Sequence, residues 1–154
     1  MKNGLKLTTA LFVFSSIFGL EGCVNSTMNL SRVSLNGVVA GCERSYRHGE
    51  FVRAIEYCTE AAGRGHDHSY ITLGNLYYER AMEDMLLTSP SERNVLYYSN
   101  LNDLLGTARD CFFTYLEKHR NEEAVSMLSV IDGLIWRNNI YMMHRLRGIN
   151  ETNL

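Results

Sequence analysis

The segment AAGRGHDHSYITLGNLY, residues 61–77, decides the fold of this 154-residue chain. In the first part of this segment, an apolar stretch with helical spacing ends at Gly63 and Gly65, and glycines are typical helix stops. In its second part, apolar residues recur at intervals of three and four from Tyr70 onward, as on one face of a helix. The segment therefore predicts two helices that meet at a short turn near residues 63–67.

The helical spacing continues on both sides of this turn. From Leu35 onward no alternating strand pattern appears, and the isolated pair Asn36-Gly37 lacks the β-branched flanks of a hairpin. We therefore predict an all-α fold of antiparallel helix hairpins closed by two longer C-terminal helices. The expected helices cover residues 35–47, 50–63, 67–87, 90–118 and 121–146.

The fourth helix has the most explicit predicted start. Ser89-Pro90-Ser91-Glu92 combines an N-cap serine, a proline at the first helical position and a glutamate placed to cap back. The helix is therefore expected to begin at residue 90. Gly106 in its middle leaves open a kink or a division into two helices.

The composition describes one ordinary globular domain. The chain is 45% hydrophobic and 21% charged, contains a single proline, and has a formal net charge of −2. This charge balance provides no bulk attraction for nucleic acid, so we expect no nucleic-acid partner.

The first residues have the pattern of an export signal. Lys2 and Lys6 precede an apolar run that ends at Leu20, too short for a membrane-spanning helix. Leu20-Glu21-Gly22-Cys23 resembles the lipobox of bacterial lipoproteins, in which the cysteine is acylated and the preceding peptide is removed. Glu21 departs from the small or apolar residue usual there, and an ordinary signal peptide before an incidental cysteine is the alternative.

This resemblance implies a division of the chain and a location. Residues 1–22 would be the signal peptide, 23–34 the lipidated start and tether, 35–148 the helical domain and 149–154 a tail. Acyl chains on Cys23 would hold the protein on a membrane without a spanning helix. Val24 is not the aspartate associated with inner-membrane retention, so the resemblance points to the outer membrane, facing the periplasm.

Residues 61–77 also resemble the junction of a Sel1-like repeat, a subclass of the tetratricopeptide superfamily. The spacing Ala-Ala-x2-Gly-x7-Leu-Gly-x2-Tyr is matched from Ala61 to Tyr77, and Gly49 to Ala61 follows the second-helix pattern with Cys58 at the usual aromatic position. The likeness covers about residues 35–80. It ends at Arg80, where these repeats usually carry glycine. Independently of this likeness, the small residues Ala54 and Gly74 predict a close approach between facing helices.

Proteins of this superfamily bind partners in a groove lined by the first helix of each repeat. The resemblance implies that six residues face such a groove: Glu43, Tyr46, Arg47, Asn75, Tyr78 and Glu79. Because Glu43 and Glu79 do not provide a basic clamp for a terminal carboxylate, the expected ligand is a mixed-charge protein surface.

Candidate chemistry is sparse. His66-Asp67-His68 brings two imidazoles and a carboxylate together, but no cysteine or acidic partner with metal-ligand spacing follows. Neither a Ser–His–Asp order nor a phosphate-cradling glycine loop is visible. We therefore expect no catalytic residues, metal or cofactor.

The expected function is that of a protein–protein scaffold or assembly factor in the cell envelope, with an envelope protein as partner. The alternatives are a small envelope enzyme or ligand binder acting on cell-wall material, and a structural subunit of a secretion or pilus apparatus.

Two cysteines lie at comparable distances from one helical turn. Cys42 and Cys58 flank residues 48–50 on consecutive antiparallel helices, so their side chains should be neighbours. In an oxidising compartment we expect them to form a disulfide, with two buried free thiols as the alternative. Cys111 would then be an inward-facing free thiol, although pairing with Cys58 is left open.

Overall fold

The computed structural model describes residues 29–148, which form only helices. The α-helices are α1 (Leu35–Arg47), α2 (Phe51–Gly63), α3 (His68–Leu87), α4 (Val95–Leu116) and α5 (Glu122–Leu146), and two short 3-10 helices are η1 (Leu30–Arg32) and η2 (Pro90–Glu92). The all-α prediction is confirmed. The expected signal peptide, Cys23 and the tail of residues 149–154 lie outside the described residues.

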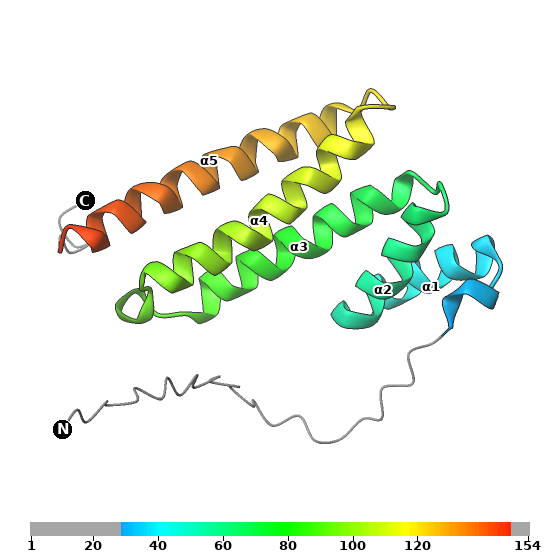
Figure 1. The fold of residues 1–154 in the computed structure, drawn as a ribbon, viewed down its shortest axis with the longest axis horizontal. Coiled ribbons are helices and arrows are strands. Elements are labelled where there is room, and N and C mark those ends of the chain that lie inside the picture. Colours follow the sequence, from blue (N-terminus) through cyan, green and yellow to red (C-terminus); the bar gives the residue numbers. More distant parts are fainter. Residues whose placement is uncertain (1–28, 149–154) are drawn as a thin grey trace, which may run out of the picture.

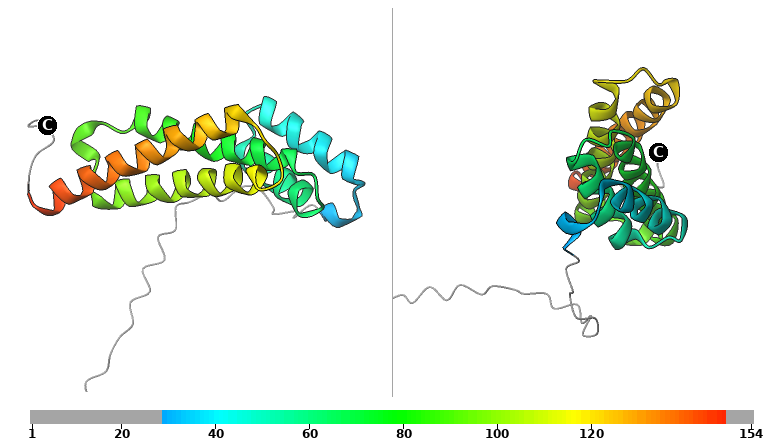
Figure 2. Two further views of the ribbon diagram at one scale, coloured as in Figure 1. Left: turned by 90° about the horizontal axis from the view of Figure 1, so that it is seen from above. Right: turned by 90° about the vertical axis from the view of Figure 1, so that its right-hand side faces the viewer.

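The helices form an elongated body (Figures 1 and 2). The three longer helices α3, α4 and α5 run side by side, each antiparallel to the next. The α1–α2 hairpin packs against α3 at one end of the body. Consequently α3 connects the α1–α2 hairpin to α4 and α5.

Side-chain caps and glycines define the helix ends. Gly49 and Gly65 adopt positive φ angles of 68° and 89° in the turns after α1 and α2, a conformation that favours glycine. At the start of α5, the Asn121 side chain accepts a hydrogen bond from the backbone N–H of Ala124 at 2.9 Å. The helix stop that the sequence predicted at Gly65 is confirmed by the turn after α2.

The predicted start of the fourth helix is wrong by five residues. Glu92 does accept hydrogen bonds from the backbone N–H and the hydroxyl of Ser89, at 3.3 and 2.8 Å, but these close only the 3-10 turn η2. The α-helix begins at Val95, where the Asn94 side chain accepts from the N–H of Tyr97 at 2.9 Å. From there α4 continues to Leu116 without a division at Gly106.

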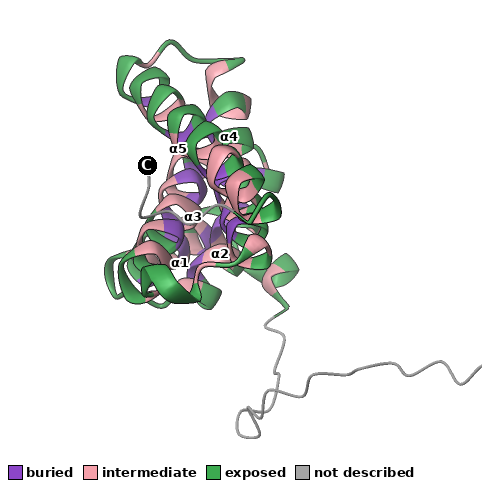
Figure 3. Cartoon of the chain, turned by 90° about the vertical axis from the view of Figure 1, so that its left-hand side faces the viewer, coloured by how far each residue is buried: buried purple, intermediate pink, exposed green. Residues whose placement is uncertain are grey.

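The core consists of two clusters along α3. One lies between α3, α4 and α5 and includes Leu101, Leu105, Phe112 and Ile131. The other joins the α1–α2 hairpin to α3 through Cys42, Ala54, Cys58, Leu73 and Leu76. Figure 3 shows the buried positions facing inward between the helices, with exposed positions on the outside.

Two glycines allow these helices to pack closely. A β-carbon on Gly74 would stand 2.8 Å from the ring of Phe112, so the side chain for which Gly74 makes room comes from α4. A β-carbon on Gly41 would overlap the ring of Tyr57 across the α1–α2 hairpin. Real β-carbons do not approach other atoms so closely, so a larger residue at either position would force its neighbour to shift.

Arg64 forms hydrogen bonds to the backbone of the segment that precedes α1. Arg64, at the end of α2, donates from Nη1 to the carbonyl oxygen of Val33 at 2.6 Å and from Nη2 to that of Leu30 at 2.5 Å. Glu60 accepts from the same guanidinium at 2.7 Å. The last part of the predicted tether, residues 30–33, therefore lies against the end of α2.

Candidate functional site

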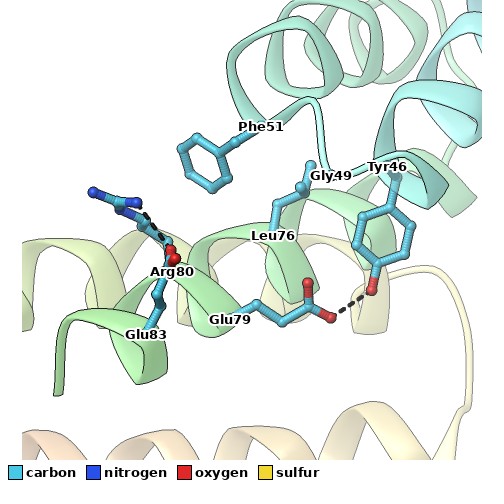
Figure 4. A pocket seen from close by; sticks show the side chains of 7 residues that line it. All are labelled: Tyr46, Gly49, Phe51, Leu76, Glu79, Arg80 and Glu83. Carbon is cyan, nitrogen blue, oxygen red and sulfur yellow. Dashed lines mark hydrogen bonds and ion pairs between the residues drawn. The ribbon is translucent and has the colours of Figure 1, made fainter. Parts of the chain in front are cut away.

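A pocket of about 330 Å³ opens where the α1–α2 turn meets the middle of α3 (Figure 4). The α1–α2 hairpin contributes Tyr46, Gly49 and Phe51, and α3 contributes Leu76, Glu79, Arg80 and Glu83. Residues from one face of α3 reach it because 76, 79, 80 and 83 are spaced by three and four. The pocket thus combines two aromatic rings with two carboxylates and one guanidinium.

One hydrogen bond crosses the pocket from α1 to α3. The hydroxyl of Tyr46 donates to Oε1 of Glu79 at 2.6 Å. Partial burial raises the pKa of Tyr46 to about 12, with the hydrogen bond and the negative charge of Glu79 acting in the same direction. The phenol therefore keeps its proton at neutral pH, and Tyr46 and Glu79 fix the position of each other.

Arg80 forms the opposite side of the pocket. Its guanidinium pairs with Glu83 at 2.9 Å and with Asp84 at 3.5 Å, and its central carbon lies 6.0 Å from the ring centroid of Phe51. These groups are roughly half exposed, so the ion pairs contribute little to stability. A binding partner can displace such pairs at small cost.

The structure brings together two of the six predicted groove residues. Tyr46 and Glu79 line the pocket, whereas Glu43 and Arg47 lie on an exposed part of α1, with Nε of Arg47 donating to the carbonyl oxygen of Glu43 at 3.4 Å. Asn75 is half-buried outside the pocket lining. Tyr78 packs against the cluster formed by α3, α4 and α5, which explains why it does not reach the pocket.

Sequence reasoning did not assign five of the seven lining residues to a site: Gly49, Phe51, Leu76, Arg80 and Glu83. Arg80 was noted only as the point where the likeness to a repeat ends. The spacing of Leu76, Arg80 and Glu83 on one helical face contained the necessary information for α3. Nothing in the sequence indicated that Phe51 lies beside that face.

The His66-Asp67-His68 run has a structural environment of its own. Asp67 accepts from Nζ of Lys118 at 2.8 Å and contacts Nε2 of His119 at 3.2 Å, and these bonds lower the pKa of its carboxyl group. His66 is bonded through Nδ1 to the hydroxyl of Ser69 at 2.9 Å. Asp67 therefore links the α2–α3 turn to the end of α4. Among the described residues no cluster of His, Cys, Asp or Glu is suited to hold a metal ion.

Cys42 and Cys58 form a disulfide, as the hairpin register predicted. Their sulfur atoms are 2.02 Å apart and their α-carbons 4.7 Å apart. Cys111 is a free thiol that packs against the same cluster. Burial raises the pKa of Cys111 to about 11, and the nearby charge of Asp110 adds to the shift. This thiol is poorly suited to act as a nucleophile near neutral pH.

The comparisons with known proteins found no matching family model, curated protein or solved structure. Within residues 29–148, none of the helices has the length and apolar character needed to cross a membrane. The functional inference is therefore based on the geometry of the pocket and on the sequence patterns.

Proposed function

We propose that this chain is a lipid-anchored bacterial envelope protein that binds another envelope protein through the pocket between the α1–α2 turn and α3. It would act as a scaffold or assembly factor rather than as an enzyme. The observation that carries this proposal is the grouping of Tyr46, Phe51, Glu79 and Glu83 around one open pocket. Anchoring through Cys23 and a location at the outer membrane are further parts of the proposal, supported by the lipobox-like sequence before that residue.

A Sel1-like arrangement of helix hairpins is also proposed. The succession α1, α2, α3 and α4, in which each helix packs on the next, is compatible with two such hairpins, and the spacing from Ala61 to Tyr77 supports it. In that arrangement α1 and α3 are the first helices of their repeats. The pocket would then lie on the side that repeat proteins of this type use for binding.

The chemistry of the pocket favours a partner with a basic and an apolar group close together. Phe51 offers apolar surface, and aromatic side chains provide large contact area in protein interfaces. Glu79 and Glu83 offer negative charge, and a basic side chain of the partner would replace Arg80 as the ligand of Glu83. The proposed ligand is therefore an exposed segment of a protein with Lys or Arg next to a hydrophobic residue.

Site-specific photo-cross-linking in the native type of host tests this function. A benzophenone derivative of phenylalanine at position 51 should give one discrete cross-linked species, because it keeps the aromatic ring of Phe51 beside the pocket and leaves both carboxylates in place. Adding Glu79→Lys should abolish that species through charge repulsion, while the matched change Glu56→Lys on the exposed side of α2 should leave it unchanged.

The controls separate loss of binding from loss of folding. Glu79 and Glu56 are both exposed, so both variants should keep the helical circular dichroism of the parent. Equal cross-linking from positions 51 and 56, or cross-linking that survives Glu79→Lys, would contradict a partner site in this pocket.

A further inference from the structure

A second pocket, of about 190 Å³, lies at the other end of the body, where the end of α3, the start of α4 and the second half of α5 meet (left side of Figure 1). None of its lining residues is acidic and two are arginines: Met85, Arg93, Tyr97, Tyr98, Leu101, Arg137, Asn138 and Tyr141. This composition distinguishes it from the pocket of the proposed function, which contains two carboxylates.

Among residues 29–148, neither arginine of this pocket forms an ion pair with a carboxylate. Arg93 donates to backbone carbonyl oxygens only, to that of Met85 at 2.7 Å and to that of Thr88 at 3.1 and 3.2 Å. Arg137 is exposed, and in the part of the chain that the structure describes it makes no ion pair. Neutral carbonyls orient a guanidinium but do not cancel its charge. Both charges therefore remain available to an anion.

The surroundings add to the positive field. Between Gly133 and Asn150 the sequence contains Arg137, Arg145 and Arg147 but no Asp or Glu. Of the carboxylates on neighbouring elements, Asp84 pairs with Arg80 at 3.5 Å, whereas Glu92 accepts hydrogen bonds from the neutral Ser89 and keeps its charge. In a chain whose overall charge is −2, this end is locally basic.

The walls of the pocket are held in place by packing. Tyr98 is 2% exposed and stacks on Tyr141 with ring centroids 5.7 Å apart. Asn138 is 1% exposed, and its amide donates to Oδ1 of Asn102 at 3.0 Å. The ring of Tyr97 lies 5.9 Å from the guanidinium of Arg93. A site with fixed walls costs less free energy to organise when a ligand binds.

The size of the pocket limits what it can hold. Its 190 Å³ is below the range of about 300–1,000 Å³ that encloses a whole drug-sized ligand. It therefore suits one compact group rather than a complete molecule. Two arginines that line one pocket from different elements suit a phosphate, which carries several acceptor oxygens and one to two negative charges.

We propose that this pocket binds a phosphate group, with Arg137 as the main ligand and Arg93 as a fixed positive charge beside it. The group could belong to a soluble phosphate compound or to the headgroup of an anionic lipid, which present the same chemistry. The proposal is independent of the protein-binding function, because the two pockets share no residue.

Titration of the ¹⁵N-labelled full chain with inorganic phosphate and with glycerol 3-phosphate, at constant ionic strength, tests the site by NMR. We expect saturable shifts at Tyr97, Arg137 and Tyr141. Arg137→Gln should weaken binding about tenfold or more, as for the loss of a hydrogen bond to a charged group. Arg137→Lys should give an intermediate affinity, and Arg44→Gln, which removes the same charge from an exposed position of α1, should leave binding unchanged.

A second arm identifies the source of the phosphate. Sedimentation with phosphatidylglycerol vesicles is compared with sedimentation with phosphatidylcholine vesicles, for the parent and for Arg137→Gln. Phosphatidylglycerol-dependent sedimentation that Arg137→Gln removes supports a lipid headgroup, and saturable NMR shifts without it support a soluble phosphate compound. Shifts that do not saturate, or that are equal in all variants, together with sedimentation that survives Arg137→Gln, would overturn the proposal.

Discussion

The ring of Phe112 of α4 fills the space in the core that a side chain at Gly74 of α3 would occupy. A β-carbon at residue 74 would stand within 3.0 Å of three ring atoms, and Phe112 is itself 1% exposed. The ring cannot move outward, because α3 and α4 pack along their lengths. This contact sets the distance between α3 and α4.

Gly74→Ala should therefore destabilise the protein, although alanine is the better helix former. The gain in helix propensity is about 1 kcal/mol, whereas overpacking a core costs about 1–3 kcal/mol, so we expect a net loss of roughly 1 kcal/mol. Gly106→Ala is the matched control, since a β-carbon there meets no atom within 4 Å, and it should stabilise by about 0.5–1 kcal/mol. Urea denaturation of both variants measures the difference, and equal effects would contradict the assigned contact.

Removing the Cys42–Cys58 bridge should lower the free energy of unfolding. The bonded residues are 16 positions apart, and the chain-entropy model gives about 3 kcal/mol for a loop of this size. We expect this loss in Cys42→Ala/Cys58→Ala but not in Cys111→Ala, which keeps the bridge. Peptide mapping without reduction, on protein made with its export signal, checks the connectivity; alkylation of both cysteines in unreduced protein would rule the bridge out.

Stability should also decline in alkaline solution. The pKa of Tyr46 rises from 10.0 to about 12 on folding, so its contribution is complete below about pH 10 and is lost as the pH rises towards 12. Cys111 acts with the same sign between 9.0 and about 11. Urea denaturation between pH 9 and 12 should show a shallower decline for Tyr46→Phe than for the parent. Parallel curves would argue against a raised pKa of Tyr46 in the folded protein.

Lipidation of Cys23 follows from the lipobox-like sequence that precedes it. A fatty-acid probe supplied to a native type of host should label the parent protein, and Cys23→Ser should abolish the label because the acylated sulfur is absent. Cys111→Ser serves as the control for loss of an unrelated thiol. Equal labelling of the parent and Cys23→Ser would reject the anchor.

Much of the fold could be predicted because its determinants are local. Gly49 and Gly65 end helices through their own backbone conformation, and the spacing of apolar residues is a property of each helix alone. The start of α4 could not be predicted in the same way. Ser89 and Asn94 both have good capping side chains, and which of them begins an α-helix depends on how α4 docks on α3 and α5.

The candidate site was less accessible to sequence reasoning because it depends on distant pairs. Phe51 and Arg80 line one pocket only because the α1–α2 hairpin packs on the correct part of α3. Tyr78, one step along α3 from Glu79, packs against the cluster formed by α3, α4 and α5 and does not line the pocket. The Cys42–Cys58 pair was predictable because a single turn sets its register.

The hydrogen bonds from Arg64 to the carbonyl oxygens of Leu30 and Val33 have a mechanical consequence. Tension applied to the chain at residue 29 would be borne first by the guanidinium at the end of α2, through its two carbonyl bonds, and only afterwards by the first turn of α1. That turn, capped by Ser34, is a place where a helix otherwise begins to unravel. A domain held by its leading end would thus transmit load into α2, and through the Cys42–Cys58 bridge into both helices of the hairpin at once.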